Sequence, residues 1–234
     1  FHVWDYLENS RTPEAYNKIV KGDADIIFVA QPSGGQKKRA KESGVTLLYT
    51  PFAREAFVFI VNADNPVNSL TEQQVRDIFS GAITNWRAVG GNDQEIQTWQ
   101  RPEDSGSQTV MQSQVMKNVR MISPQETKVA SVMEGMIKVV AEYRNTNNAI
   151  GYTFRYYATQ MNADKNIKLL AINGITPTAE NIRNGKYPYI VDAFMVTREN
   201  TTSETQKLLE WFLTPQGQSL VEDVGYVPMY KTLP

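Results

Sequence analysis

The alternation of apolar and amphipathic segments predicts an α/β fold built on mostly parallel sheets. Short β-prone runs at residues 25–30, 45–50 and 56–62 alternate with helical patterns, an order that is typical of α/β proteins. Hydrophobic residues make up 41% of the 234 residues and charged residues 21%. The chain is therefore long and apolar enough to bury a core of its own.

The first expected helix covers residues 12–20. Thr12 stands at the N-cap, Pro13 takes the first helical position and Glu14 adds an acid to the first turn, which is typical of helix starts. Farther along, Pro51 is expected to end one strand before the next begins. The other elements expected from apolar period and flanking residues are helices over residues 37–43, between Thr71 and Gly81, and over 134–143 and 203–213, and strands over residues 96–100, 149–152, 167–172 and 187–197.

Composition excludes several classes of function. The net charge of -1 gives no overall electrostatic reason to bind nucleic acid or an anionic membrane, and the alternating aromatic residues from Tyr152 to Tyr157 are interpreted as packing. The chain has no cysteine, which excludes disulfides, thiol catalysis and cysteine-ligated zinc. Its single histidine, His2, is interpreted as incidental, and this removes most hydrolase triads. We expect no metal and no cofactor.

Features of targeting are also missing from the sequence. No apolar run approaches the roughly 20 residues of a membrane span. The chain opens at Phe1 without a basic leader, a cleavage site or a lipobox. We therefore expect a soluble chain that is either mature or trimmed.

The most informative stretch is Arg101-Pro-Glu-Asp-Ser105-Gly106-Ser107-Gln108-Thr109. Ser105 and Gln108 have capping-box spacing, which predicts a helix start with outward-facing N–H groups and a positive dipole end. Gly106 allows close approach to the backbone, and Arg101 can donate a pair of hydrogen bonds. The pattern indicates a site for a tetrahedral oxyanion. The alternative is an ordinary N-cap with a surface arginine.

Seven motifs, in this order and spacing, resemble those of the phosphate-binding proteins of phosphate ABC transporters, particularly the Gram-positive forms. The likeness covers nearly the whole chain, and it is the shared order that makes it specific. The motifs are Ser10-Arg-Thr-Pro-Glu-Ala-Tyr16, Ala24-Asp-Ile-Ile-Phe28, Phe57-Val-Phe-Ile-Val-Asn62, Ile78-Phe-Ser-Gly-Ala-Ile-Thr-Asn-Trp86, residues 101–109, Asn148-Ala-Ile-Gly-Tyr152 and Gly225-Tyr-Val-Pro228.

The resemblance implies a type II periplasmic-binding-protein fold. In this fold two α/β lobes are joined by two crossover strands and close over a ligand in the cleft between them. The crossovers are expected near residues 50–52 and 189–192. Residues 1–51 with 191–234 would then form lobe 1, and residues 52–190 lobe 2. A discontinuous first lobe explains why the sequence shows no linker.

The resemblance also implies a set of binding residues. Arg101 falls on the family's phosphate-gripping arginine, and Glu103 on an acid that orients it. Thr12 matches a family serine that faces the anion from the other lobe. The implied phosphate-binding set is Thr12, Arg101, Ser105, Gly106 and Ser107.

The sequence departs from the family pattern at two places. Ala30, followed by Gln31, stands where the family usually has an aspartate that accepts the proton of hydrogen phosphate. Gln31 both accepts and donates, so we expect weaker discrimination against sulfate. The family's first strand, anion-contacting loop and helix, which precede the segment matching Ser10, are absent from this sequence. Either the sequence as given omits them, or this member binds with a reduced site.

The function implied by the resemblance is that of an extracytoplasmic solute-binding protein, not an enzyme. Such a protein captures inorganic phosphate as a monomer, at the cell surface as a lipoprotein or in the periplasm, and delivers it to the membrane permease of an ABC transporter. A phosphatase is one alternative, although it would need a nucleophile or a metal cluster, and metal content would reveal it. The other alternative is a sensor or surface protein of the same fold that binds another oxyanion or none.

Overall fold

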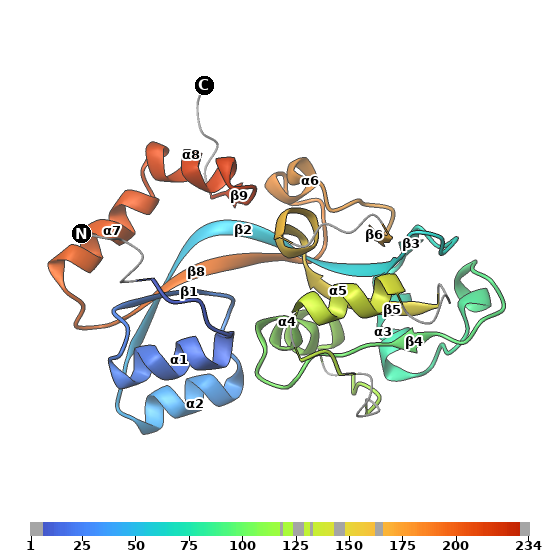
Figure 1. Ribbon diagram of the computed structural model, residues 1–234, viewed down its shortest axis with the longest axis horizontal. Helices are drawn as coiled ribbons and strands as arrows, with labels where there is room; N and C mark the ends of the chain where they lie inside the picture. The colour runs from blue at the N-terminus through green and yellow to red at the C-terminus, as the bar shows by residue number, and fades with distance from the viewer. Residues whose placement is uncertain are drawn as a thin grey trace.

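The computed structural model describes residues 7–117, 119–123, 129–131, 133–142, 148–161 and 166–229. His2 and the expected helix end at Tyr143 lie outside these ranges. Two lobes lie side by side along the long axis, and two long strands pass between them (Figure 1). Within the described ranges, no helix has the length and apolar character that crossing a membrane requires.

The connecting strands are β2 (Leu47–Asn62) and β8 (Ile190–Arg198). They pair antiparallel from Leu47↔Arg198 to Ala56↔Ile190, with a register irregularity between Pro51 and Ala53. The prediction that Pro51 ends a strand is wrong, because β2 continues through it. Proline lacks the N–H of a regular ladder, and a bulge is one of the few places in a sheet where it fits.

Most strands pair antiparallel, so the predicted parallel sheets are wrong. β1 (Ile26–Val29) pairs antiparallel with β8, and β5 (Ala149–Phe154) with β2. Alternation of strands and helices gives parallel neighbours only where successive strands lie side by side. Here the order β1-β8-β2-β5-β4 inserts the late strand β8 between two early strands. The parallel ladders of the described residues are short: β4 (Gln97–Thr98) with β5, and β3 (Ser69–Leu70) with β7 (Ala171–Ile172).

Lobe 1 packs helices against the sheet formed by β1, β8 and the first half of β2 (Figure 1). The N-cap of α1 is Arg11, one residue before the Thr12 that the sequence predicts, and the buried face of the helix includes Tyr16 and Ile19. These two side chains pack with Ile27 and Val196 in a small hydrophobic cluster. The helices of this lobe are α1 (Thr12–Lys21), α2 (Gly34–Glu42), α7 (Ser203–Phe212) and α8 (Pro215–Asp223).

Lobe 2 contains the larger core, which is centred on the second half of β2. Phe57 and Phe59 are fully buried there, and Tyr152 of β5 packs against both rings. Its other elements are α3 (Glu72–Ser80), η2 (Trp86–Val89), α4 (Gly106–Val110), η3 (Met111–Met116), α5 (Met133–Glu142), η6 (Tyr157–Met161), β6 (Ile167–Leu169) and α6 (Ala179–Arg183). Strand β9 (Val227–Pro228) returns to pair with β2, and Val227 joins this core. The lobe boundaries after residues 51 and 190 stay a prediction.

Candidate functional site

The predicted helix start at Ser105 is present. Ser105 is the N-cap of α4, and its Oγ accepts a hydrogen bond from the Gln108 backbone N at 3.2 Å. α4 runs directly into the π-helical η3, so the helical segment spans residues 106–116. The capping box is only half formed, because the Gln108 side chain accepts a hydrogen bond from the Tyr152 hydroxyl instead of reaching back to Ser105.

Arg101 is buried, with 7% of its surface exposed. Its Nε donates to Ser107 Oγ at 3.3 Å and its Nη1 to the Ala130 carbonyl at 2.7 Å. Both acceptors are neutral. No carboxylate of the described residues lies within ion-pair distance of this guanidinium. Burial lowers the pKa of Arg101, as expected for a cation that lacks a counter-charge.

Glu103 does not orient Arg101 in this structure. Its side chain is exposed, and the guanidinium is held by Ser107 and Ala130 instead. The expected pairing is therefore corrected: a hydroxyl and a backbone carbonyl fix the arginine, and neither neutralises it.

Residues of lobe 1 close directly over the start of α4. A carbon at the Cβ position of Gly106 would lie 3.1 Å from Ala30 Cβ and 3.3 Å from Thr12 Oγ1. Thr12, at the start of α1, and Gly106 thus face each other across the interface between the lobes. The structure brings together all five predicted binding residues, because Ser105, Gly106, Ser107 and Arg101 share one buried turn.

The loop after β1 also reaches lobe 2. The Ala30 carbonyl accepts a hydrogen bond from the Tyr16 hydroxyl at 3.1 Å, which ties this loop to α1. Gln31 Nε2 donates to Ser113 Oγ in η3 at 2.8 Å. The Gln31 amide nitrogen therefore has a bond across the interface, and the carbonyl oxygen is the part that could accept a hydrogen bond from a protonated anion.

Sequence reasoning missed the role of Tyr152. Its hydroxyl accepts a hydrogen bond from the Arg101 backbone N at 3.0 Å and donates to Gln108 Oε1, so it connects both ends of the turn. Burial raises the pKa of this phenol. The available signal was the burial expected for a strand tyrosine, since a buried phenol hydroxyl needs a partner. Its partner at Arg101 lies 51 residues away, beyond the reach of a local motif.

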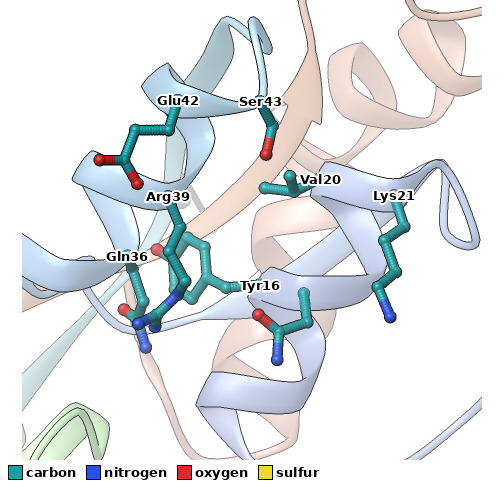
Figure 2. A pocket seen from close by; sticks show the side chains of 8 residues that line it. Tyr16, Val20, Lys21, Gln36, Arg39, Glu42 and Ser43 are labelled. Carbon is teal, nitrogen blue, oxygen red and sulfur yellow. The ribbon is translucent and has the colours of Figure 1, made fainter.

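A cavity of about 300 Å³ lies between α1 and α2 on lobe 1, and its lining includes Tyr16, Lys21 and Arg39 (Figure 2). None of the predicted binding residues lines it. The described part of the chain contains no cluster of three or more acidic or histidine side chains that could hold a metal ion.

Two α/β lobes on a pair of crossover strands, with a buried cation where they meet, define a two-lobed binding protein. The family model of the PBP superfamily domain matches residues 5–216, and the chain belongs to this family. The periplasmic-binding-protein fold that the resemblance implied is thereby confirmed.

Several proteins of similar sequence are named phosphate-binding proteins. The phosphate-binding protein PstS of Bacillus subtilis is 29% identical over 170 residues, which cover 72% of this chain and 53% of the Bacillus protein. The phosphate-binding protein PstS of Borreliella burgdorferi is 26% identical over 215 residues, which cover 91% of this chain and 74% of the Borreliella protein. The chain thus spans about half the length of the Bacillus relative. A protein described as a phosphate ABC transporter substrate-binding protein, from Clostridium perfringens and with bound phosphate, superposes with a TM-score of 0.76 at 24% identity, covering 93% of this chain and 84% of that one.

Proposed function

We propose that the chain captures inorganic phosphate between its lobes and delivers it to the membrane permease of an ABC transporter. The observation that carries this proposal is the buried guanidinium of Arg101, which has only neutral partners among the described residues. An uncompensated buried charge costs several kcal/mol, and a bound anion would remove that cost. The names of the curated relatives support phosphate as the anion.

The donors around Arg101 suit a tetrahedral anion. The helical segment of residues 106–116 directs its first N–H groups and its positive dipole end toward the interface. Thr12 contributes a hydroxyl from the opposite lobe, close to Gly106. Nη2 of Arg101 makes no hydrogen bond with the described residues, so we assign it to the ligand. The set binds by charge and hydrogen bonds, and none of its members is a general base that would activate one of its hydroxyls as a nucleophile, so we propose binding without covalent chemistry.

Delivery to a permease requires a location outside the cytoplasm. We propose that the protein works as a monomer, at the cell surface as a lipoprotein or in the periplasm. The related names include that of a phosphate ABC transporter component, which supports the permease as partner. In the competing reading, favoured by Ala30 in place of an aspartate, the same fold senses another oxyanion.

Calorimetric titration of the phosphate-free chain tests the proposal. Phosphate should bind with one site per chain, whereas a chain that has lost ligand binding would give no heat with phosphate or with sulfate. Tighter binding of sulfate than of phosphate would favour the sensing alternative.

A further inference from the structure

Asp104 makes contacts between the lobes that the anion site does not account for. It belongs to the turn of lobe 2 that carries Arg101, one residue before the α4 N-cap. Its backbone is left-handed, with a φ of 65°, a conformation that is uncommon outside glycine and that aspartate tolerates better than most residues. This conformation lets its carboxylate face lobe 1 while Ser105 begins the helix.

The partners of Asp104 all come from the first turns of α2. Ser33, the N-cap of α2, donates its hydroxyl to Asp104 Oδ1. Gln36 Nε2 donates to the Asp104 carbonyl at 3.1 Å, and Arg39 Nη2 lies 3.3 Å from Oδ2. Ser33 and Gln36 are buried, so their bonds are less exposed to solvent than an ordinary surface ion pair. In Figure 2 the Arg39 side chain extends toward Gln36.

The Asp104 carboxylate lies close to the backbone of α2. A carbon at the Cβ position of Gly35 would lie 3.3 Å from Asp104 Oδ1. The carboxylate thus sits beside the start of a nine-residue helix, where the helix dipole favours a negative charge. Lobe 1 thus surrounds the carboxylate of a lobe 2 side chain with hydrogen-bond donors and a cation.

We infer that Asp104 is a latch between the lobes, whose contacts with α2 set the fraction of closed protein before any ligand binds. A contact that exists only in the closed form shifts the population toward that form. A protein that is already partly closed binds its ligand more tightly, because less of the binding energy goes into closure. Only this effect on affinity depends on the proposed phosphate function; the effect on closure does not.

The structure offers a matched control. Arg183 of α6 and Glu222 of α8 form another arginine–carboxylate pair, 2.7 Å apart. The two side chains of this pair are 41% and 43% exposed, and those of Arg39 and Asp104 are 46% and 31% exposed. In Figure 1, α6 and α8 lie on the opposite side of β2 and β8 from α1 and α4. Loss of this pair should not separate the lobes on the side where Asp104 meets α2.

The test measures lobe separation without a ligand. Because the chain has no cysteine, cysteines can be introduced at the exposed positions Lys38 and Asn92, one on each lobe, and spin-labelled for distance measurement. Asp104→Gly should shift the ligand-free distribution to longer distances, since glycine keeps the left-handed backbone and removes the carboxylate. Glu222→Gln should leave the distribution unchanged.

A second variant covers the case in which Asp104→Gly does not fold. Arg39→Gln should shift the same distribution by a smaller amount, and both substitutions together should open the protein by less than the sum of their effects. Phosphate affinity should fall by about three- to tenfold in Asp104→Gly. Unchanged ligand-free distances in the folded Asp104 and Arg39 variants would overturn the latch. Absence of phosphate binding by the parent chain would refute the proposed function and leave the distance result standing.

Discussion

The backbone N of Arg101 donates a hydrogen bond to the phenol of Tyr152 at 3.0 Å, and the same phenol donates to Gln108. One buried side chain of β5 therefore fixes both ends of the binding turn. The position of the Arg101 guanidinium depends on this bond as well as on its own contacts with Ser107 and Ala130.

Tyr152→Phe should weaken phosphate binding several-fold and reduce the free energy of unfolding by about 1–3 kcal/mol, because two buried hydrogen-bonding groups lose their partner. Titration and chemical denaturation measure the two effects. Tyr187→Phe is the matched control, since the buried Tyr187 hydroxyl donates to the Phe57 carbonyl at 3.1 Å, away from the turn. Equal losses of affinity in both variants would mean that Tyr152 acts only through stability.

Gly106→Ala should lower phosphate affinity with little change in stability. The added methyl would lie 3.1 Å from Ala30 Cβ and 3.3 Å from Thr12 Oγ1, so it would resist closure of lobe 1 over the helix start. Gly34→Ala serves as control, because nothing lies within 4 Å of its Cβ position. Calorimetry on both variants checks this, and full affinity in Gly106→Ala would show that the ligand-bound lobes do not approach each other at this point.

Ala30→Asp should sharpen the preference for phosphate over sulfate. A carboxylate there would accept the proton of hydrogen phosphate and would repel a fully ionised anion. Titrations of parent and variant with both anions, at fixed ionic strength, measure the change. Strong rejection of sulfate by the parent chain would assign the acceptor role to another group, for which the Gln31 carbonyl is the candidate.

Glu55, buried in the crossover strand β2, should make stability depend on pH. Burial raises its pKa from 4.5 to about 7, although the Ala56 and Tyr156 backbone N–H groups bond to the carboxylate. The folded state therefore holds this proton more tightly than the unfolded state. The contribution of this carboxyl group to the free energy of unfolding is constant below pH 4.5 and is lost as the pH rises to about 7. The loss is at most about 3 kcal/mol.

Thermal unfolding across that pH range tests the Glu55 prediction. Glu55→Gln should remove the decline in stability between the two pKa values. A parent and a variant with parallel pH profiles would show that Glu55 titrates normally.

Local patterns predicted the helix boundaries that depend on neighbouring residues. The N-cap at Ser105 and the helix ending at Gly81 rest on contacts within one turn of the chain. The start of α2 was missed, although Ser33-Gly-Gly-Gln36 is itself a capping box, with Gln36 N bonded to Ser33 Oγ at 3.1 Å. Two adjacent glycines favoured a loop there, and the reciprocal side-chain bonds outweigh their cost.

Features that depend on the tertiary fold could not be predicted in this way. The antiparallel pairing of β2 with β8 joins residues more than a hundred positions apart, so local alternation gave the wrong strand direction. The binding turn was identified, but its support was not: Ser107 and Ala130 hold Arg101 in place of Glu103, and Ala130 lies 29 residues away.

The phosphate affinity of Arg101→Gln, compared with that of the parent chain, decides whether the anion binds at the Arg101 guanidinium. We expect a loss of binding free energy on the order of 2–5 kcal/mol, because the substitution removes the charge partner of a buried anion. Arg87→Gln, at an exposed arginine of lobe 2, should bind as the parent does. A folded Arg101→Gln variant that binds phosphate as tightly as the parent would contradict the assignment of the anion to this site.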